Sequence, residues 1–360
     1  MRRALFIAQR GRGRTSPNPI VGAVVVTPDG VVVGQGAHLK AGEPHAEVHA
    51  LAEAGLRADG ATLYCTLEPC AHTGRTPACA PRVADARIAR AVIAMTDPNP
   101  RVAGAGIALL ESRGIRVDSG LCAEDAARDN AAFLTWIRRG RPHVTLKIAR
   151  TEDGYVGRTP SPAASAGGDR LRLTSAAMDR LMHRQRAEID AIAVGAGTML
   201  ADDPLLTARG AFRERPLVRV IFDWRLRCAG DRRLYRTLDR GPVLIVTTEE
   251  AAGANREAAE DLGRRGVEIV TLQRRDLTAA LNVLGDRSVT SLLVEGGPSL
   301  QDAFAAADLV DRVQTITVPR TLGSGVAEPR LLALEGRLSA PRETRAGGDV
   351  LLEADVHRAD

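Results

Sequence analysis

Short apolar runs that alternate with helix-forming segments are the feature that most limits how this chain can fold. IVGAVVV (20–26), VVVGQG (31–36) and ATLYCTL (61–67) have the pattern of strands. HAEVHALAEAGL (45–56) has the spacing and the residue types of a helix. Such alternation is typical of an α/β fold, in which helices pack on a sheet. Only 3% of the residues are aromatic, so the core must consist mostly of Ala, Val, Leu and Ile.

The alternation stops and restarts near residue 140. IRRGRPHV (137–144) ends a helix in Arg and Gly, and Pro142 blocks its continuation before a new strand begins. At 360 residues the chain is also long for a single core. We therefore predict two α/β domains, residues 1–140 and 141–360.

Further elements are expected from the same patterns. In the first half these are helices over 3–10, 79–86, 104–113 and 123–137 and strands over 90–95 and 114–117. In the second half they are strands over 143–149, 191–196, 218–222, 243–248 and 291–297 and helices over 175–187 and 298–307. The Pro-, Ala-, Ser- and Gly-rich stretch 158–169 is expected to be a surface loop.

Charge and composition limit the kinds of partner that we expect this chain to bind. The net charge is +5, but no block of consecutive basic residues and few aromatic residues are present to bind and stack on a nucleic acid. A small phosphorylated ligand is the better match. No apolar run reaches the ~18 residues that a membrane span needs, and the N-terminus lacks a signal-peptide core. We expect a cytoplasmic protein, where thiols stay reduced and a Cys70–Cys79 disulfide is disfavoured.

One constellation of residues predicts chemistry. His45 and Glu47 form H-x-E, and Pro69–Cys70 and Cys79 follow downstream, as in zinc-dependent deaminases. One imidazole and two thiolates would leave the fourth zinc position open for water, whose pKa zinc lowers to about 7. Glu47 would then take the proton of that water and pass it to the substrate.

Some of these residues also suggest two other kinds of site, a metalloprotease site and a structural zinc site. HAEVH (45–49) places two histidines four residues apart, but a metalloprotease needs its Glu directly after the first His. The general deaminase signature has two residues between its cysteines, whereas eight separate Cys70 from Cys79. A purely structural zinc site would need a fourth protein ligand, for which His72 is the only nearby candidate.

Longer segments resemble one family, the bifunctional deaminase–reductases of riboflavin biosynthesis (RibD family). The eight-residue cysteine spacing is that family's form of the deaminase motif. The segments that carry the likeness are TSPNPIVGAVVV (15–26), AGEPHAEVHAL (41–51), TLEPCAHTGRTPAC (66–79), TDPNPRVAGAGIALL (96–110), GTMLADDPLLTAR (197–209) and LLVEGGPSL (292–300).

The resemblance implies a fold and two reactions. The N-terminal domain would be a cytidine-deaminase-like α/β/α domain that uses Zn²⁺ to deaminate 2,5-diamino-6-ribosylamino-4(3H)-pyrimidinone 5′-phosphate. The C-terminal domain would be a dihydrofolate-reductase-like α/β domain that uses NADPH to reduce the ribosyl group to ribityl. The expected partners are this small phosphorylated pyrimidine and further copies of the chain, with no nucleic acid and no membrane.

The resemblance also implies roles for residues of this chain. Zinc would be held by His45, Cys70 and Cys79, with Glu47 as the catalytic proton carrier. Substrate would contact Asn18, Arg186, Leu206, Arg209 and Glu295. We add Lys147, which matches a family lysine in the first strand of the second half, and His72, which lies between the cysteines. NADPH would contact Thr198, Asp202, Gly297, Pro298, Ser299, Leu300, Gln301, Asp302 and Ala303. EGGPSL follows an apolar strand and opens a helix, as a phosphate-binding turn does.

The chain departs from the family before the helix at 175. Arg170 replaces a serine that contacts substrate, and Arg172 replaces a tryptophan against the cofactor. These changes leave open a deaminase whose second domain is not catalytic. A tRNA or nucleobase deaminase is a further hypothesis, which the cysteine spacing and the second α/β domain disfavour.

Overall fold

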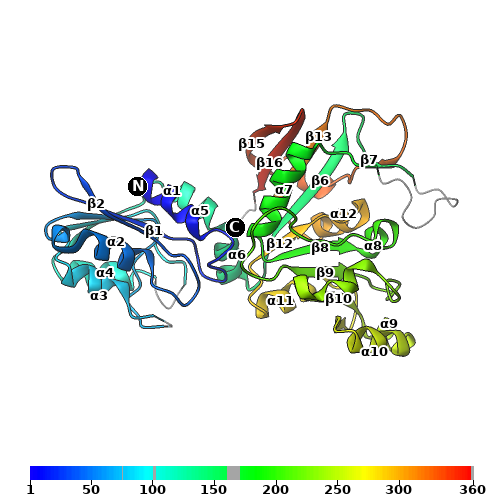
Figure 1. Ribbon diagram of the computed structural model, residues 1–360, viewed down its shortest axis with the longest axis horizontal. Coiled ribbons are helices and arrows are strands. Elements are labelled where there is room, and N and C mark those ends of the chain that lie inside the picture. The colour runs from blue at the N-terminus through cyan, green and yellow to red at the C-terminus, as the bar shows by residue number, and fades with distance from the viewer. Residues whose placement is uncertain (75, 100–102, 160–170, 358–360) are drawn as a thin grey trace. The chain divides into compact units, whose positions relative to one another are not determined.

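The chain divides into two units, Met1–Arg141 and Pro142–Asp360 (Figure 1). The computed structural model describes residues 1–74, 76–99, 103–159 and 171–357. Most of the loop expected over 158–169 lies outside the described residues. Both units combine a sheet with helices, so the predicted α/β class is confirmed. Within the described ranges, no helix has the length and apolar character needed to cross a membrane.

The first unit contains a five-stranded sheet in the order β2-β1-β3-β4-β5. β1 is antiparallel to both its neighbours, whereas β3, β4 and β5 run parallel. The strands are β1 (Gly22–Val26), β2 (Val32–Ala37), β3 (Thr62–Cys65), β4 (Arg90–Ile93) and β5 (Arg116–Ser119). The helices are α1 (Arg2–Ala8), η1 (Gln9–Gly11), α2 (Ala46–Ala54), η2 (Gly55–Ala58), α3 (Cys79–Asp85), α4 (Ala105–Ser112), α5 (Ala123–Asp129) and α6 (Ala131–Arg139).

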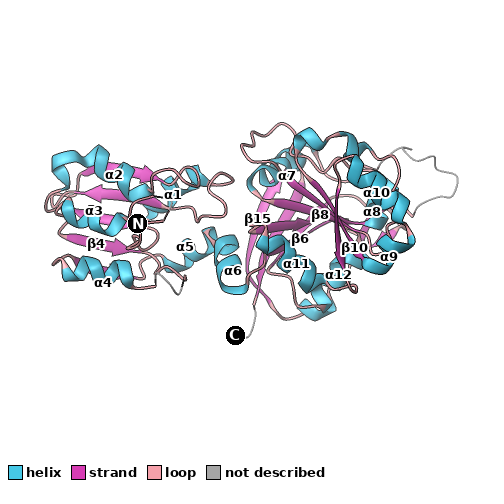
Figure 2. Cartoon of the chain, turned by 90° about the horizontal axis from the view of Figure 1, so that it is seen from below, coloured by secondary structure: helices cyan, strands magenta, loops and turns pink. Residues whose placement is uncertain are grey.

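Side chains of β1 alternate between the two faces of this sheet. Ala23 and Val25 belong to the core beneath α2, α3 and α4, whereas Val24 packs with Ala4 and Ile7 of α1. The period of two along a strand sends neighbouring residues to opposite faces. Helices therefore cover both faces, and the unit is an α/β/α sandwich (Figure 2).

Two glycines of β2 bring α2 unusually close to the sheet. A Cβ atom at Gly34 would lie 2.0 Å from the carbonyl oxygen of Ala50, and one at Gly36 would lie 2.2 Å from that of Ala46. Ala46, Ala50 and Ala54, spaced four residues apart, form the buried face of the helix. Small residues on both surfaces thus fix the position of α2, which begins directly after His45.

The single helix predicted over 123–137 is divided in two at Asn130. This residue is buried, and its side chain bonds to the backbone of Ile20 instead of facing solvent. Asn130 Oδ1 accepts from the Ile20 N–H at 2.8 Å, and Nδ2 donates to the Ile20 carbonyl at 3.0 Å. The contact joins segments that are distant in sequence, so local periodicity could not reveal the break.

The second unit contains a nine-stranded sheet in the order β11-β10-β9-β8-β12-β6-β13-β16-β15. Its strands are β6 (His143–Thr151), β8 (Ala191–Gly195), β9 (Val218–Phe222), β10 (Val243–Thr248), β11 (Glu268–Leu272), β12 (Ser291–Val294), β13 (Arg312–Val318), β15 (Leu338–Ala346) and β16 (Asp349–Val356). A separate two-stranded ribbon consists of β7 (Tyr155–Gly157) and β14 (Val326–Ala327). Its helices are α7 (Ala176–Glu188), α8 (Ala196–Asp202), η3 (Arg233–Arg236), η4 (Leu238–Arg240), α9 (Glu249–Ala254), α10 (Arg256–Arg264), α11 (Leu277–Asp286), α12 (Pro298–Ala306) and η5 (Leu332–Leu334).

The strands at the centre of this sheet place the candidate reductase residues. β8, β12 and β6 are parallel neighbours, so their carboxyl ends meet at one edge. Ligands of open α/β sheets bind at such an edge. The turns after β8 and β12 are close, because a Cβ atom at Gly296 would lie 3.1 Å from the backbone nitrogen of Gly195.

Candidate active sites

Three metal-ligating side chains converge in the first unit. His45 Nδ1 lies 3.6 Å from Cys70 Sγ and 3.3 Å from Cys79 Sγ, and the three ligand atoms all lie within 4.8 Å of one another. His45 is the residue before α2, Cys70 follows β3, and Cys79 is the first residue of α3. One imidazole and two thiols are a donor set that fits Zn²⁺ with one coordination position to spare.

The eight-residue insertion between the cysteines is closed by backbone hydrogen bonds. The Cys70 carbonyl accepts from the N–H groups of Cys79 and Ala80, both at 3.0 Å. The Cys79 N–H also points at Cys70 Sγ, at 3.4 Å. The hydrogen bond from the Cys79 thiol, supported by His45, lowers the pKa of Cys70. A thiol that ionises readily is suited to metal binding.

Thr76 holds the His45 ring from inside this insertion. Its Oγ1 lies 3.2 Å from His45 Nε2, while His45 Nδ1 faces the two sulfur atoms. A hydrogen on Nε2 that is donated to Thr76 leaves the Nδ1 lone pair directed at the metal position. Thr76 is not predicted from the sequence, because no motif spacing distinguishes it from a loop threonine.

Glu47 shares a cavity with His45 although the two are only two residues apart. The extended backbone of His45 (φ −76°, ψ 167°) turns its side chain away from the helical direction, so both side chains reach the same space. Glu47 is 4% exposed, and its Oε2 has no hydrogen-bond partner among the described residues. Burial raises the pKa of Glu47. A buried carboxylate oxygen without a partner is prepared to receive a proton.

The cavity measures about 290 Å³ and includes the other predicted residues of this unit. Among the residues that line it are Asn18, His38, His45, Glu47, Glu68, Cys70, His72, Thr76, Asp97, Asn99 and Phe133. Asn18 and His72 are predicted substrate contacts, whereas His38, Glu68, Asp97 and Asn99 were not singled out from the sequence.

His38 sets the orientation of the Asn18 amide. Its Nδ1 lies 3.3 Å from the Pro44 carbonyl, and its Nε2 lies 3.2 Å from Asn18 Nδ2. Burial lowers the pKa of His38, so the ring stays neutral and its Nδ1–H donates to Pro44. Nε2 then accepts from the Asn18 amide, whose Oδ1 is left as the acceptor for a ligand.

Glu68 organises the wall of the cavity. Its Oε1 accepts from the N–H groups of Gly106 (2.8 Å) and Ile107 (3.1 Å), which belong to the first turn of α4. Its Oε2 accepts from the N–H groups of Asp97 and Gly104, both at 3.1 Å. The residue next to Pro69–Cys70 therefore caps α4 and anchors the segment that carries Asp97.

A buried charge network lies in the second unit. Glu295, directly after β12, accepts from Arg186 Nε at 2.7 Å and from Arg186 Nη2, and Lys147 Nζ lies 3.9 Å away. Burial alone would raise the pKa of Glu295, but Arg186 and Lys147 outweigh it and lower this pKa to about 2. The structure thus brings together three predicted substrate residues, which come from β6, α7 and the end of β12.

The predicted cofactor residues lie around the start of α12. Gly297 precedes the helix, Pro298 is its first residue, and the Gly297 N–H donates to Thr198 Oγ1 at 2.9 Å. Two side chains of the 297–303 segment have protein partners, because Gln301 donates to the Lys147 carbonyl and Asp302 accepts from the Leu331 N–H. Ser299, Leu300 and Ala303 follow on α12, Asp202 is exposed at the end of α8, and Leu206 is buried.

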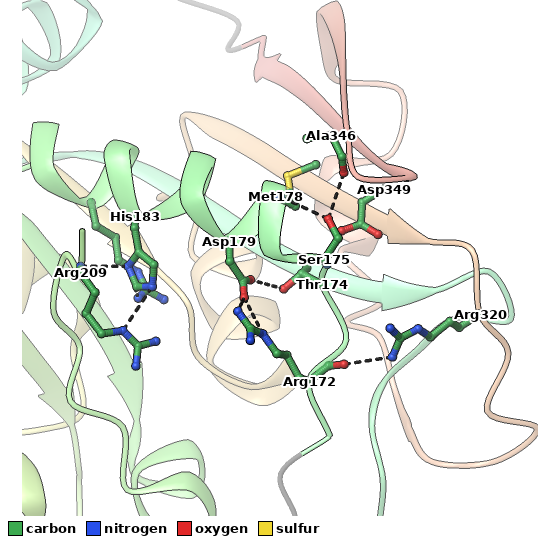
Figure 3. Close-up of polar contacts among 11 residues, drawn as sticks. Arg172, Thr174, Ser175, Met178, Asp179, His183, Arg209, Arg320, Ala346 and Asp349 are labelled. Carbon is green, nitrogen blue, oxygen red and sulfur yellow. Dashed lines mark hydrogen bonds and ion pairs between the residues drawn. The ribbon is translucent and has the colours of Figure 1, made fainter. Parts of the chain in front are cut away.

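Figure 3 shows the polar contacts of Arg172, which lies before α7 where the family has a tryptophan. Arg172 is exposed and pairs with Asp179, which also accepts from Thr174 Oγ1. Ser175 caps α7 by accepting from the Met178 N–H at 3.2 Å. Arg170 lies outside the described residues.

Comparison with known proteins assigns each unit to a family. Residues 1–95 match the cytidine and deoxycytidylate deaminase zinc-binding region, and residues 142–349 match the RibD C-terminal domain. The two matches fall on the unit with the His45–Cys70–Cys79 site and on the unit with the Glu295 network.

Full-length relatives extend the match. The riboflavin biosynthesis protein RibD of Aquifex aeolicus is 40% identical over 91% of this chain and 88% of its own length, and that of Escherichia coli is 39% identical over 90% and 88%. The chain is also similar to solved structures. Acinetobacter baumannii RibD is 33% identical, with a TM-score of 0.84, and the match covers 99% of this chain and 98% of that one. A Thermotoga maritima diaminohydroxyphosphoribosylaminopyrimidine deaminase/5-amino-6-(5-phosphoribosylamino)uracil reductase is 31% identical, with a TM-score of 0.84, and the match covers 99% of this chain and 97% of that one. The likeness read from the sequence motifs is confirmed: the chain is an enzyme with a deaminase and a reductase domain, and it belongs to the RibD family of riboflavin biosynthesis proteins.

Proposed function

We propose that this chain deaminates 2,5-diamino-6-ribosylamino-4(3H)-pyrimidinone 5′-phosphate in its first unit and reduces the ribosyl group of the product in its second. The observation that carries the proposal is the convergence of His45, Cys70 and Cys79 beside the unpartnered oxygen of Glu47. A cavity of about 290 Å³ adjoins these groups and offers room for a pyrimidine ring.

In the deaminase unit, His45, Cys70 and Cys79 would hold zinc. Zinc is a Lewis acid that would lower the pKa of a bound water molecule, so that it can lose a proton at neutral pH. Glu47 would carry one proton from the attacking water to the ring nitrogen, and then a second proton, from the hydroxyl group that has added to the ring, to the departing amine. Its burial supports both roles, because a raised pKa makes the carboxylate a stronger base. Asn18, oriented by His38, would accept a hydrogen bond from the pyrimidine.

In the reductase unit, NADPH would supply the hydride. Its phosphates would lie at the start of α12, where backbone N–H groups and the helix dipole favour anions. Lys147 and the ionised Glu295 would contact the sugar at the shared edge of β6 and β12. Arg172, which stands where the family has a tryptophan, is held by an ion pair with Asp179 of the same unit.

A coupled assay tests both halves of the proposal. Purified full-length chain with a measured zinc content is given the diaminopyrimidine substrate, and amine release and NADPH oxidation are followed together. We expect both signals. Amine release without NADPH oxidation at saturating enzyme would show that the second unit is not catalytic, and activity on tRNA alone would replace the proposed substrate.

Two further expectations belong to this proposal. Cys70 and Cys79 are grouped with His45 as metal ligands and are not joined in a disulfide, which supports a reducing compartment such as the cytoplasm. Self-association is supported by β15, an exposed edge strand of the large sheet that a second copy could extend.

A further inference from the structure

Ile20 occupies a central place in the wall of the deaminase cavity. Its neighbours in the chain, Asn18, Pro19 and Val21, all line the cavity, whereas the Ile20 side chain is buried in the protein. Ile20 precedes β1, which begins at Gly22. A buried backbone N–H or C=O group needs a hydrogen-bond partner. The group that binds the Ile20 backbone therefore decides where three cavity residues lie.

Asn130 supplies the partner for both backbone groups of Ile20. Its Oδ1 accepts from the Ile20 N–H at 2.8 Å, and its Nδ2 donates to the Ile20 carbonyl at 3.0 Å. Nδ2 also donates to the Ala126 carbonyl at 3.3 Å. A side-chain amide offers the same donor and acceptor as a peptide group. Asn130, which is 4% exposed, thus takes the place that a neighbouring strand would have beside Ile20.

The side chain of Asn130 is not used to cap its own helix. Asn130 is the residue before α6, a position at which asparagine is favoured because it can accept from the first N–H groups of the helix. Its side chain makes no such bond, and only its backbone carbonyl accepts, from the Leu134 N–H at 2.9 Å. The amide is directed at Ile20 instead. The helix that begins here carries Phe133, which lines the same cavity.

The segment with Asn18 is held from a second direction by His38. The His38 N–H donates to the Val21 carbonyl at 2.9 Å, and the His38 ring lies 3.2 Å from the Asn18 amide nitrogen. The Asn18 N–H donates to the Thr15 carbonyl at 2.9 Å. These bonds fix the two ends of the segment. The clamp from Asn130 fixes its middle.

We propose that Asn130 is a positioning residue of the deaminase, which holds Asn18 at the cavity through the backbone of Ile20. Because Asn130 also begins the helix that carries Phe133, one side chain sets two parts of the cavity wall. Asn130 and Phe133 lie beyond residues 1–95, the part of the chain that matches the zinc-binding region. The inference rests on the proposed function, because the ligand of Asn18 is the pyrimidine proposed above.

The first test is steady-state deamination by the full chain with Asn130→Ser. Serine is also favoured before a helix, so α6 keeps its start, but one hydroxyl group cannot span the two groups of Ile20 as an amide does. We expect KM for the diaminopyrimidine to rise about tenfold, since two buried hydrogen bonds are lost. The zinc content should not change, and kcat should stay within about threefold, because Glu47 and the zinc ligands lie on other elements. Unchanged KM, or a fall in kcat alone, would overturn the proposal.

Asp129→Ala is the matched control, one residue earlier in the chain. Asp129 accepts from Gln9 Nε2 at 2.7 Å and from Arg12 Nη2 at 2.9 Å, so its loss also loosens the end of α5. We expect KM for the diaminopyrimidine to stay at the wild-type value. An equal rise in KM would show that any loosening of α5 has the same effect, and Asn130 would then have no specific role. NADPH oxidation with deaminated substrate is the internal control and should be unchanged in both variants.

A double-variant cycle tests whether Asn130 acts through Asn18. Once Asn18→Ala has removed the amide, its position no longer matters to the substrate. Asn130→Ser and Asn18→Ala together should therefore raise KM by less than the product of their separate effects. A full product would show that Asn130 acts elsewhere.

Hydrogen exchange tests the clamp without substrate and without turnover. In the full chain, the Ile20 amide hydrogen should exchange about tenfold faster in Asn130→Ser than in wild type, and the Asp129→Ala rate should match wild type. Unchanged exchange in Asn130→Ser overturns the inference whatever the substrate is. Faster exchange in a chain that releases no amine from the diaminopyrimidine would count against the proposed substrate alone.

Discussion

At the residue scale, the unpartnered oxygen of Glu47 leads to the sharpest prediction about deamination. Glu47→Gln keeps the size of the side chain but cannot accept a proton, so we expect amine release to fall by about 10²–10⁴-fold. Zinc content, measured by atomic absorption, should stay at the wild-type level. Glu53→Gln, an exposed position on the same helix, serves as the control. Full deamination by a zinc-loaded Glu47→Gln chain would remove Glu47 from the mechanism.

Thr76 leads to a prediction about metal affinity at the same scale. Thr76→Val removes the oxygen that faces His45 Nε2 and frees the ring to rotate. Losing such a supporting bond costs about 10–100-fold in metal affinity. Competition with a chromophoric chelator measures this, and Thr76→Ser should restore the wild-type value. If the valine and serine variants bind zinc equally well, Thr76 does not orient the ligand.

At the element scale, Glu68 joins the start of α4 to the cavity wall. Glu68→Ala leaves four N–H groups without their acceptor, so we expect the first unit to lose about 1–3 kcal/mol of unfolding free energy. KM for the diaminopyrimidine should rise more than kcat falls, because the Asp97 segment loses its anchor while Glu47 stays in place. Denaturant unfolding and steady-state kinetics check this, with exposed Glu111→Gln on α4 as the control. A fall in kcat alone would assign Glu68 to the chemistry instead.

The contact between β2 and α2 makes a second prediction for an element. A Cβ atom at Gly36 would lie 2.2 Å from the Ala46 carbonyl and 2.6 Å from the Cβ of His49, so Gly36→Ala must push α2 away. Overpacking of this kind costs about 1–3 kcal/mol, and the displaced helix start should also weaken zinc binding. Gly253→Ala, where no atom lies within 4 Å, is the matched control. Thermal unfolding and zinc content give the readout, and a variant that keeps both would show that the helix accommodates the methyl group.

At the scale of the whole molecule, metal removal should separate the two activities. Among the described residues, the grouping with metal-site geometry is His45, Cys70 and Cys79 in the first unit. The Glu295 network belongs to the second unit. We expect a chelator to abolish amine release by the full chain and to leave NADPH oxidation with deaminated substrate unchanged, and zinc should restore amine release. Loss of both activities would show that the second unit depends on the metal.

The sequence by itself determined the α/β class and the identity of the family. Both follow from local patterns, since apolar runs of strand length alternate with helical spacing and the HAE and PC…C segments carry the deaminase chemistry in their residue types. β15 was not predicted from these patterns, because it is an exposed strand and no apolar face repeats every second residue along it.

Only the tertiary structure decided which side chains support those residues. Asn130 ends a helix because it binds Ile20, Thr76 reaches His45 across a closed insertion, and His183 meets Arg209 from a different element. Each contact joins positions far apart in the chain. Hydrogen bonds of this kind depend on where the packed core places two segments, and no periodicity or spacing in either segment encodes the other.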